Sequence, residues 1–455
     1  MAQLQETINS KQGEDKFGRH LGLVGATNIG LGAMLGGGIY VISGTAAGII
    51  GPALIVAYLV TGLLAMFTAV NYAEIASSIP KQGGGYTFAH DTLGGFPAFM
   101  TGWFLMIGNI VACGLYALAV AHTLVVFIAD GSQYIALIAL IIIAITFITN
   151  IISVKSVSGV LGVLNIVQAI ILFSFVAIGL AFIEPTNLIP FFVENAGLPA
   201  FMATVSFIYI SFVGFELVTS ASEEIKDPAR NVPRAIFLTV AIGTGVYMAA
   251  SLVLVGVVPF TQIAESFTPI ADVFEAMIPG AIIIGLAGMA ASNYAALNAT
   301  FLAGARIVYS MGRDRFLPAS FESVSKKLKT PIPALILVFV LVSLFALSAD
   351  VVLVAQLAVF GYLIAQAIVN FAVVILRRKG LSVPGTFKAP LFPFFPVLGV
   401  GICLLLIPSL DWVVLQIGGI LALIGFVIFL VYGWRRNRAY VDILNGNNDE
   451  SVTDQ

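Results

Sequence analysis

Twelve long apolar stretches, separated by short polar or Pro/Gly-rich segments, dominate the pattern of this 455-residue chain. A helix that crosses a bilayer needs about 20 mostly apolar residues. The apolar runs are continuous, whereas the strands of a membrane β-barrel alternate over about 10 residues. We therefore expect an all-α polytopic membrane protein with twelve transmembrane helices. The stretches cover residues 22–48, 52–78, 95–128, 133–150, 158–183, 200–222, 233–258, 279–311, 332–348, 352–376, 392–409 and 412–434.

Composition agrees with this pattern and removes several other classes of protein. Only 10% of the residues are charged and 59% are hydrophobic, whereas a soluble domain carries about 25% charged residues. The net charge of −2 argues against nucleic acid as a partner, because nucleic-acid binding needs a basic surface. The two cysteines, Cys113 and Cys403, lie in apolar runs. We therefore expect no disulfide framework, no metal site and no cofactor.

The positions of Lys and Arg predict the orientation, because cytoplasmic loops collect these residues. With the N-terminus inside and twelve spans, all 21 Lys and Arg residues fall on the cytoplasmic side, and the outer loops carry only acidic residues. One missed or extra span would move the downstream basic clusters outside. The polar first twenty residues lack the apolar core of a signal peptide. We therefore expect a multi-pass protein of the plasma (cell inner) membrane, surrounded by the lipid bilayer, with cytoplasmic tails at residues 1–20 and 435–455.

Two acidic residues, Glu74 and Glu216, remain inside the predicted spans, and no basic residue remains there. An ionisable group within the membrane is costly and is by default a candidate functional group. Glu74 lies near the cytoplasmic end of the second span, where its side chain could reach water, so a structural and a functional role stay open. Glu216 lies deeper, and we favour a functional role for it over simple pairing with a backbone donor.

Glycine predicts a break in two of the spans. Gly36, Gly37 and Gly38 follow one another in the first span, and each costs about 1 kcal/mol relative to Ala inside a helix. A close-packing face is the alternative, since Gly32 and Gly36 have the small-xxx-small spacing. Gly214 stands beside Glu216 in the sixth span. Breaks at matching positions of two halves indicate a transporter site at the membrane midplane. Freed N–H groups and carbonyls suit a zwitterionic amino acid, although a bare cation could also use the carbonyls.

Four motifs resemble the amino acid–polyamine–organocation transporter superfamily, and the resemblance covers residues 20–435. The motifs are IGLGAMLGGGIYVISG (29–44), YAEIASSIPKQGGGYTFAHDTLGG (72–95) continuing into TGW (101–103), FVGFELVTSASEEIKDPARNVPRAI (212–236) and ARIVYSMGRDRFLP (305–318). The resemblance implies a LeuT-like five-plus-five inverted repeat with broken helices 1 and 6. The first repeat would cover residues 21–183, the second 200–376, and two accessory helices 392–434. SSIPKQGGGY would form a short cytoplasmic element between spans 2 and 3.

The resemblance also implies a substrate site. Backbone N–H groups of Gly36, Gly37 and Gly38 would bind a carboxylate, and carbonyls around Ile210, Ser211, Val213 and Gly214 an amino group, with carbonyls of Ala33 and Met34 contributing. Ile210 stands where many members carry an aromatic lid, so Tyr209 or Phe212 would replace that lid. Asn109 would line the pocket, although it could also only bridge two helices. On the eighth span Asn293, Tyr294 and Asn298 form a polar stripe, and we expect Asn298 to be nearest the pocket.

Coupling residues follow from the same resemblance. Some proton-coupled members carry a lysine in the fifth span, and Gln168 stands at that position here. A neutral amide cannot take up and release a proton in that role, which puts a lysine-type switch in doubt. A sodium ion would need hydroxyl ligands such as Ser292 or Thr300. Glu216 could instead be the protonation site, or it could recognise a positive side chain of the substrate.

The leading hypothesis is a secondary active transporter that moves amino acids, or related organic amines, by alternating access, with a proton or sodium as the possible coupling ion. The alternative is an inorganic-cation transporter, for example for potassium, on the same scaffold. That alternative would need more carboxylates in the core, or a carbonyl-lined filter. An intramembrane enzyme is disfavoured, because His20, His90 and His122 are scattered and form no metal-binding pair.

Overall fold

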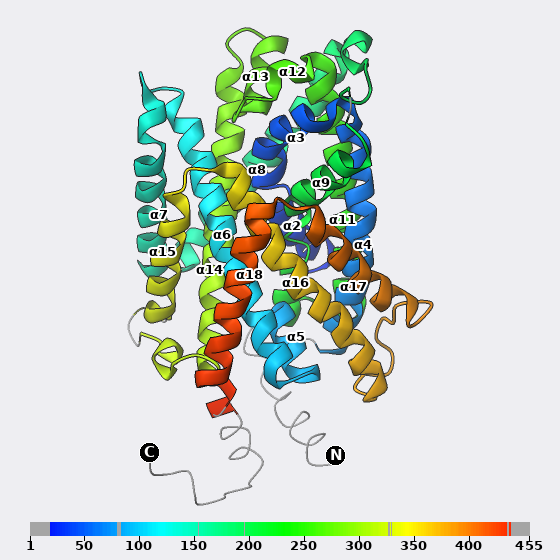
Figure 1. Ribbon diagram of the computed structural model, residues 1–455, viewed down its shortest axis with the longest axis vertical. Coiled ribbons are helices and arrows are strands. Elements are labelled where there is room, and N and C mark those ends of the chain that lie inside the picture. The colour runs from blue at the N-terminus through cyan, green and yellow to red at the C-terminus, as the bar shows by residue number, and fades with distance from the viewer. Residues whose placement is uncertain are drawn as a thin grey trace, which may run out of the picture.

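The computed structural model describes residues 19–79, 83–152, 154–194, 196–325, 328, 330–434 and 436–437. Within these residues every regular element is a helix, apart from a single backbone bridge between Leu21 and Ile225. The long helices run roughly along one axis (Figure 1). α12 and α13 lie at the upper end of this view, and α5 and the last turns of α16 and α18 lie at the lower end.

The helices have the following bounds. The first half contains α2 (Leu23–Met34), α3 (Ser43–Ile50), α4 (Leu54–Ser78), α5 (Gly84–Thr92), α6 (Gly95–Val125), α7 (Ile135–Ile152) and α8 (Val154–Gly179). The second half contains α9 (Leu198–Ile208), α10 (Leu217–Ser220), α11 (Pro228–Val257), α12 (Phe260–Ile263), α13 (Pro269–Met277), α14 (Ile282–Arg313), α15 (Ile332–Ala346) and α16 (Val351–Arg378). α17 (Phe394–Leu406) and α18 (Trp412–Ile428) follow.

Among the described residues, nine segments are long and apolar enough to cross a membrane. The first of them, Leu23–Ser78, has 56 residues and contains α2, α3 and α4. Two shorter apolar helices, Ile332–Ala346 and Phe394–Ser409, accompany the nine. The prediction of an all-helical membrane protein is confirmed. The motif SSIPKQGGGY (77–86), expected to form a short element, instead spans the end of α4 at Ser78 and the start of α5 at Gly84, and its residues 80–82 lie outside the described ranges.

Burial separates the central helices from those at the periphery. The apolar window of α6 is 100% buried, whereas those of α7 with its preceding turn, α8 and α18 are only 22–28% buried. α6 packs mainly against α14 and α16. The peripheral helices are apolar on their outward faces as well, as expected where a helix contacts lipid rather than water. The protein interior therefore lies along α6, and a buried site has to lie beside this helix.

Two helices are interrupted where glycine predicts it. α2 ends at Met34, residues 35–36 are not helical, and the chain continues through a π-helical turn at Gly38–Ile42 into α3. The second interruption follows α9, where a 3₁₀ turn η7 (Tyr209–Phe212) leads to extended backbone at Val213 (ψ 128°). Gly214 has φ 133°. This backbone conformation is accessible to glycine and costly for residues with a Cβ, so the interruption depends on this glycine.

Glu74 has a basic partner, although no basic residue lies inside the predicted spans. Arg377 at the end of α16 donates to both carboxylate oxygens of Glu74, at 2.5 and 2.8 Å. The backbone N–H of Ala389 donates to the same carboxylate at 2.8 Å, and Glu74 is fully buried. A bidentate guanidinium with an extra backbone donor satisfies a buried carboxylate. Glu74 therefore holds α4, α16 and the following loop together, as a structural role requires, and its side chain does not reach water.

Candidate functional site

The two helix interruptions lie against one another. A Cβ on Gly38 would fall 2.2 Å from Oγ of Ser211, and a Cβ on Gly214 would fall 2.9 Å from the backbone of Ala33 and Met34. Neither glycine can gain a side chain without displacing the opposite segment. Residues 33–38 and 211–214 thus bring together backbone groups that are not part of a continuous helix. The sequence predicted both segments, but not that they touch.

Tyr247 of α11 contacts both interruptions, a role that the sequence analysis did not predict. Its hydroxyl lies within hydrogen-bond distance of the carbonyl of Met34 and of the carbonyl of Ser211, at 2.7 Å in the second case. A phenol has one hydrogen to donate, so it serves one of these carbonyls at a time. Tyrosine is common in apolar spans, and only three-dimensional contacts identify this one. The carbonyl of Ser211, an expected ligand of an amino group, therefore has a protein donor.

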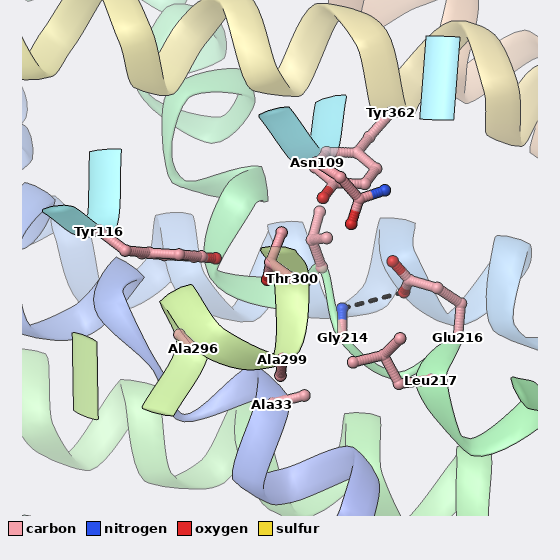
Figure 2. A pocket seen from close by; sticks show the side chains of 11 residues that line it. Ala33, Asn109, Tyr116, Gly214, Glu216, Leu217, Ala296, Ala299, Thr300 and Tyr362 are labelled. Atoms are coloured by element: carbon pink, nitrogen blue, oxygen red, sulfur yellow. Dashed lines mark hydrogen bonds between the residues drawn. The ribbon is translucent and has the colours of Figure 1, made fainter. Parts of the chain in front are cut away.

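A cavity of about 20 Å³ lies beside the interruptions, with room for about one water molecule. Figure 2 shows the side chains around it. Six of the lining residues are among those predicted: Ala33, Asn109, Val213, Gly214, Glu216 and Thr300. Five were missed: Tyr116, Leu217, Ala296, Ala299 and Tyr362. The missed residues are alanine, leucine and tyrosine, which within an apolar span give no sequence signal for a site.

Glu216 is the charged residue of this cavity. One carboxylate oxygen accepts a hydrogen bond from the backbone N–H of Gly214 at 2.9 Å (Figure 2). Tyr116 of α6 and Tyr362 of α16 line the same cavity, and the ring of Tyr72 of α4 packs edge-on against Phe215, the residue before Glu216. Within the described part of the chain, Glu216 forms no ion pair with Lys, Arg or His. A buried carboxylate without a counter-charge calls for a proton or a cationic group.

The polar side chains on the other walls are Asn109 and Thr300. Asn109 donates from Nδ2 to the carbonyl of Leu105 at 2.6 Å, one turn back in α6. This bond is local, so Asn109 does not bridge two helices through it. Thr300 lies on α14 together with Ala296 and Ala299. Residues 293, 296 and 300 share one face of a helix with 3.6 residues per turn.

Asn298 lies on a different face of α14, and its predicted position nearest the pocket was wrong. Its Oδ1 accepts from Asn150 of α7 at 3.2 Å, and its Nδ2 donates to the carbonyl of Tyr294 at 2.9 Å. Asn293 instead faces the first interruption, because its Oδ1 would lie 2.3 Å from a Cβ on Gly37. This Oδ1 and Oγ of Ser211 are buried without a hydrogen-bond partner. Two unsatisfied polar atoms therefore face the glycine run.

The predicted aromatic lid is absent from the cavity wall. The hydroxyl of Tyr209 donates to Oε1 of Gln366 at 2.6 Å, and Phe212 packs edge-on against Tyr247 at 5.3 Å between ring centroids. Ile210 is buried beside them. Neither aromatic ring lines the cavity, whereas Tyr116 and Tyr362 do. Gly36, Gly37, Gly38 and Met34 are buried next to the cavity but do not form its wall.

Two of the expected coupling residues, Gln168 of α8 and Ser292 of α14, contact the C-terminal end of α2. Gln168 donates from Nε2 to the carbonyl of Gly32 at 3.3 Å, and Ser292 donates from Oγ to the carbonyl of Leu35 at 3.4 Å. The Met34 carbonyl has a donor only when the Tyr247 hydroxyl does not donate to Ser211. A helix C-terminus attracts cations, but two of its carbonyls already have the neutral donors Gln168 and Ser292. No cluster of three His, Cys, Asp or Glu side chains suited to a metal occurs among the described residues.

Comparison with known proteins places this architecture in a family. The model of the amino acid permease family matches residues 21–435. The chain is 30% identical to the branched-chain amino acid permease BcaP of Bacillus subtilis, over 96% of this chain and 97% of that protein. It is also 30% identical to the methylthioribose transporter of the same organism, over 94% and 96% of the two chains. The vacuolar cationic amino acid transporter 4 of Arabidopsis thaliana shares 30% identity, over 80% of this chain and 64% of that protein. The chain belongs to the amino acid permease family, as its motifs predicted, and is a multi-pass membrane transport protein rather than an enzyme.

Proposed function

We propose that this member of the amino acid permease family is a secondary active transporter that moves amino acids, or related organic amines, across the plasma membrane by alternating access. The observation that carries the proposal is the contact between the two interrupted helices beside a cavity that contains Glu216. Unpaired backbone groups at such interruptions can bind both charges of an amino acid.

The walls of the cavity support a substrate with a polar and an apolar part. Ala33, Leu217, Ala296 and Ala299 offer apolar surface, whereas Glu216, Asn109 and Thr300 offer polar groups. The relatives are named for branched-chain and cationic amino acids and for methylthioribose, so amino acids are the first class to test. A cavity of about 20 Å³ is too small for any of them. Binding therefore requires the interrupted segments to separate, as alternating access does.

The proposed architecture has twelve spans with cytoplasmic termini. The 56-residue segment Leu23–Ser78 is long enough for two crossings, and Ile332–Ala346 and Phe394–Ser409 supply two more beyond the other long helices. Residues 21–183 and 200–376 form two inverted repeats, with accessory helices at 392–434. The two interruptions then occupy equivalent positions in the repeats, which supports a shared substrate site between them.

A proton is the proposed coupling ion, and Glu216 is its site. The carboxylate faces the cavity without a counter-charge, so taking up a proton removes the cost of an isolated charge. Sodium is the less favoured ion, because Gln168 and Ser292 already donate to the carbonyls at the end of α2. Thr300, the other candidate sodium ligand, lines the cavity instead.

Reconstituted uptake tests this function. Purified protein in proteoliposomes is given radiolabelled leucine, arginine, methylthioribose and putrescine, under a proton gradient and under a sodium gradient imposed separately. We expect saturable uptake of at least one amino acid, stimulated by the proton gradient and indifferent to sodium. Absence of saturable uptake or exchange of every compound would overturn the proposal. Potassium flux without any organic substrate would favour an inorganic-cation transporter, for which the cavity lining offers one carboxylate.

A further inference from the structure

A chain of buried polar side chains runs between α4 and α16, below the cavity. We call it the polar seam and define it by Thr68, Asn71 and Tyr72 of α4, Tyr209 of η7, and Gln366 and Asn370 of α16. Every one of these side chains is at most 1% exposed. Binding of a substrate at the two interruptions does not require polar side chains at this position. In a membrane protein, buried polar groups are costly unless they bind something.

Five of the six side chains of the polar seam form two hydrogen-bonded groups, and Tyr72 belongs to neither. Asn71 donates to Oδ1 of Asn370 at 2.9 Å, and Asn370 donates to Oγ of Thr68 at 3.2 Å. One turn away on α16, Oε1 of Gln366 accepts from the hydroxyl of Tyr209 at 2.6 Å. α17 closes the side of the seam, because the carbonyl of Phe395 accepts from Asn71 at 3.2 Å.

The upper end of the polar seam meets the cavity. The ring of Tyr72 packs edge-on against the ring of Phe215, the residue before Glu216, at 5.7 Å between ring centroids. The Tyr72 hydroxyl lies 2.9 Å from the position of a Cβ on Gly85, with Leu105 and Val369 next to it. Leu105 precedes the cavity residue Asn109 by one helical turn. Tyr72 therefore lies between α5 and the segment that carries Glu216.

The lower end of the polar seam meets the Glu74–Arg377 ion pair. Glu74 follows Asn71 by one turn of α4, and Arg377 follows Asn370 by two turns of α16, so both pairs lie on the same faces. The Arg377 side chain is 18% exposed. Arg378 and Lys379 follow it and are exposed, which is the charge pattern of a cytoplasmic boundary. The polar side chains thus connect the substrate cavity to this boundary.

Three atoms of the polar seam have no hydrogen-bond partner: Oδ1 of Asn71, the Tyr72 hydroxyl and Nε2 of Gln366. An unsatisfied buried polar atom costs about 1–3 kcal/mol. Groups of this kind in protein interiors normally bind ordered water, which needs two to four polar partners. Oδ1 of Asn71 is an acceptor, Nε2 of Gln366 is a donor, and the Tyr72 hydroxyl can both donate and accept. Each of the three atoms is therefore a candidate partner for a water molecule.

We propose that the polar seam is a hydrated proton path between Glu216 and the cytoplasmic side, an inference that rests on proton coupling at Glu216 in the proposed function. The protonated carboxyl of Glu216 gives its proton to the adjacent water. Each water, and the Tyr72 hydroxyl, accepts a proton on oxygen and releases one of its own. One hydronium ion leaves at the Arg377 end, Glu216 remains as a carboxylate, and Tyr72 ends neutral.

Tyr72→Phe tests the path, because it deletes a hydroxyl that makes no hydrogen bond to the protein and so leaves the packing intact. Two rates are compared in proteoliposomes loaded with a pH-sensitive dye: exchange of labelled for unlabelled leucine (or the panel compound that wild type transports fastest), and net uptake driven by a pH gradient. Exchange needs no net proton movement. We expect exchange like that of wild type, and gradient-driven uptake and dye response reduced by at least about tenfold.

Tyr86→Phe is the matched control, since it also removes a buried phenol but one that bonds Asp314, at 2.8 Å, outside the polar seam. It should lower thermal stability and leave the ratio of net uptake to exchange unchanged. Equal loss of exchange and net uptake in Tyr72→Phe would overturn the path, as would a wild-type ratio in that variant. If wild-type uptake ignores the pH gradient while exchanging substrate, proton coupling itself fails, and the proposed path fails with it.

Discussion

Among single residues, Glu216 has the most unusual environment in the transport site. A carboxylate within a membrane helix keeps its charge only if other groups stabilise it. Here one backbone N–H donates to it, and the other titratable side chains that line the cavity belong to Tyr116 and Tyr362, which are uncharged at neutral pH. The missing positive charge has two natural sources: a proton, or a second ammonium group on the substrate. These sources predict different effects of the same substitution.

Glu216→Gln distinguishes a coupling proton from an ammonium group of the substrate. The amide keeps an acceptor for the Gly214 N–H and removes only the charge. If Glu216 carries the coupling proton, leucine uptake loses its pH dependence, which for one essential proton amounts to at most about tenfold per pH unit. Uptake by the variant and wild type is measured from mildly acidic to mildly alkaline pH. An unchanged pH profile, combined with selective loss of arginine or putrescine binding, would assign Glu216 to substrate recognition instead.

The residues of the site differed in how far the sequence revealed them. Glu216 and the glycines were predictable, because a charge or a run of glycines in an apolar span has an energetic cost that needs a reason. Tyr116, Tyr362 and Tyr247 were not, since a tyrosine suits a membrane helix for many reasons. On α14, choosing between Asn298 and Thr300 required the rotation of the helix relative to α6, which only packing determines.

Among the elements, the first interrupted helix shows why a run of three glycines is needed. Gly38 contacts Ser211, Gly36 contacts Ala296, and Gly37 faces Asn293 and the ring of Tyr116, so the three glycines meet different neighbours. The structure thus supports both interpretations of the run: the helix is interrupted, and the glycines also permit close packing. The interruption and the close contact have the same cause. The glycines have no side chains, so neighbouring segments occupy the space that side chains would otherwise fill.

Gly37→Val should abolish substrate binding while leaving the protein folded. The new Cβ would lie 2.3 Å from Oδ1 of Asn293 and 2.6 Å from the Tyr116 ring, which lines the cavity and would move into it. Overpacking costs about 1–3 kcal/mol, or about five- to 150-fold in Kd. Binding is measured by substrate-induced thermal stabilisation. Gly245→Val in α11 is the control, because nothing lies within 4 Å of its Cβ position. Preserved affinity in Gly37→Val would show that the run serves packing alone.

The contact of α4 with α16 shows what sequence reasoning could not supply at this scale. Glu74 and Arg377 are 303 residues apart, and the loop count assigned Arg377 to the cytoplasmic basic cluster. That assignment was reasonable, since Arg377 ends α16 at the boundary. Its long side chain extends back to Glu74 and also lies 4.6 Å from the ring centroid of Phe392. To predict which two charged residues pair, one must know which helices are neighbours, and a hydropathy pattern does not contain this information.

Arg377→Met should destabilise the protein by about 3–5 kcal/mol, because it leaves the fully buried Glu74 without its partner. Thermal unfolding in detergent measures the loss. The double variant Glu74→Leu/Arg377→Met should recover most of it, since neither charge remains buried. Arg378→Met, a change at the exposed neighbour, is the control and should leave the melting temperature unchanged. A double variant as unstable as the single one would show that packing by the Arg377 side chain, not its charge, dominates.

Across the whole molecule, charge separates the two ends. The loop that contains α12 and α13 lies at the upper end in Figure 1 and carries Glu265, Asp272 and Glu275. Arg313 at the end of α14 and Arg377 at the end of α16 lie at the opposite end, where α5 and α18 also finish. This separation was predictable, because loop charges obey a rule that depends only on span count. The helix packing that brings the two interruptions into contact was not predictable in this way.

Thiol labelling tests this orientation on the intact molecule. Both native cysteines, Cys113 and Cys403, are buried, so the wild-type protein should react little with a membrane-impermeant maleimide. Ser132→Cys, in the exposed turn before α7, should label in intact cells, because we place that turn outside. Ser320→Cys, in the exposed turn after α14, should label only after permeabilisation. Both positions are polar, exposed and remote from the cavity, so neither change should affect transport.

The two labelled positions test the span count as well as the direction. Between Ser132 and Ser320 the proposed topology has five crossings, an odd number, so the two sites must lie on opposite sides of the membrane. Labelling of both in intact cells would mean that one span in this region does not cross, which would also break the equivalence of the two repeats. Inverted labelling would keep the span count and place the termini outside. The polar seam would then lead from Glu216 to the outer surface.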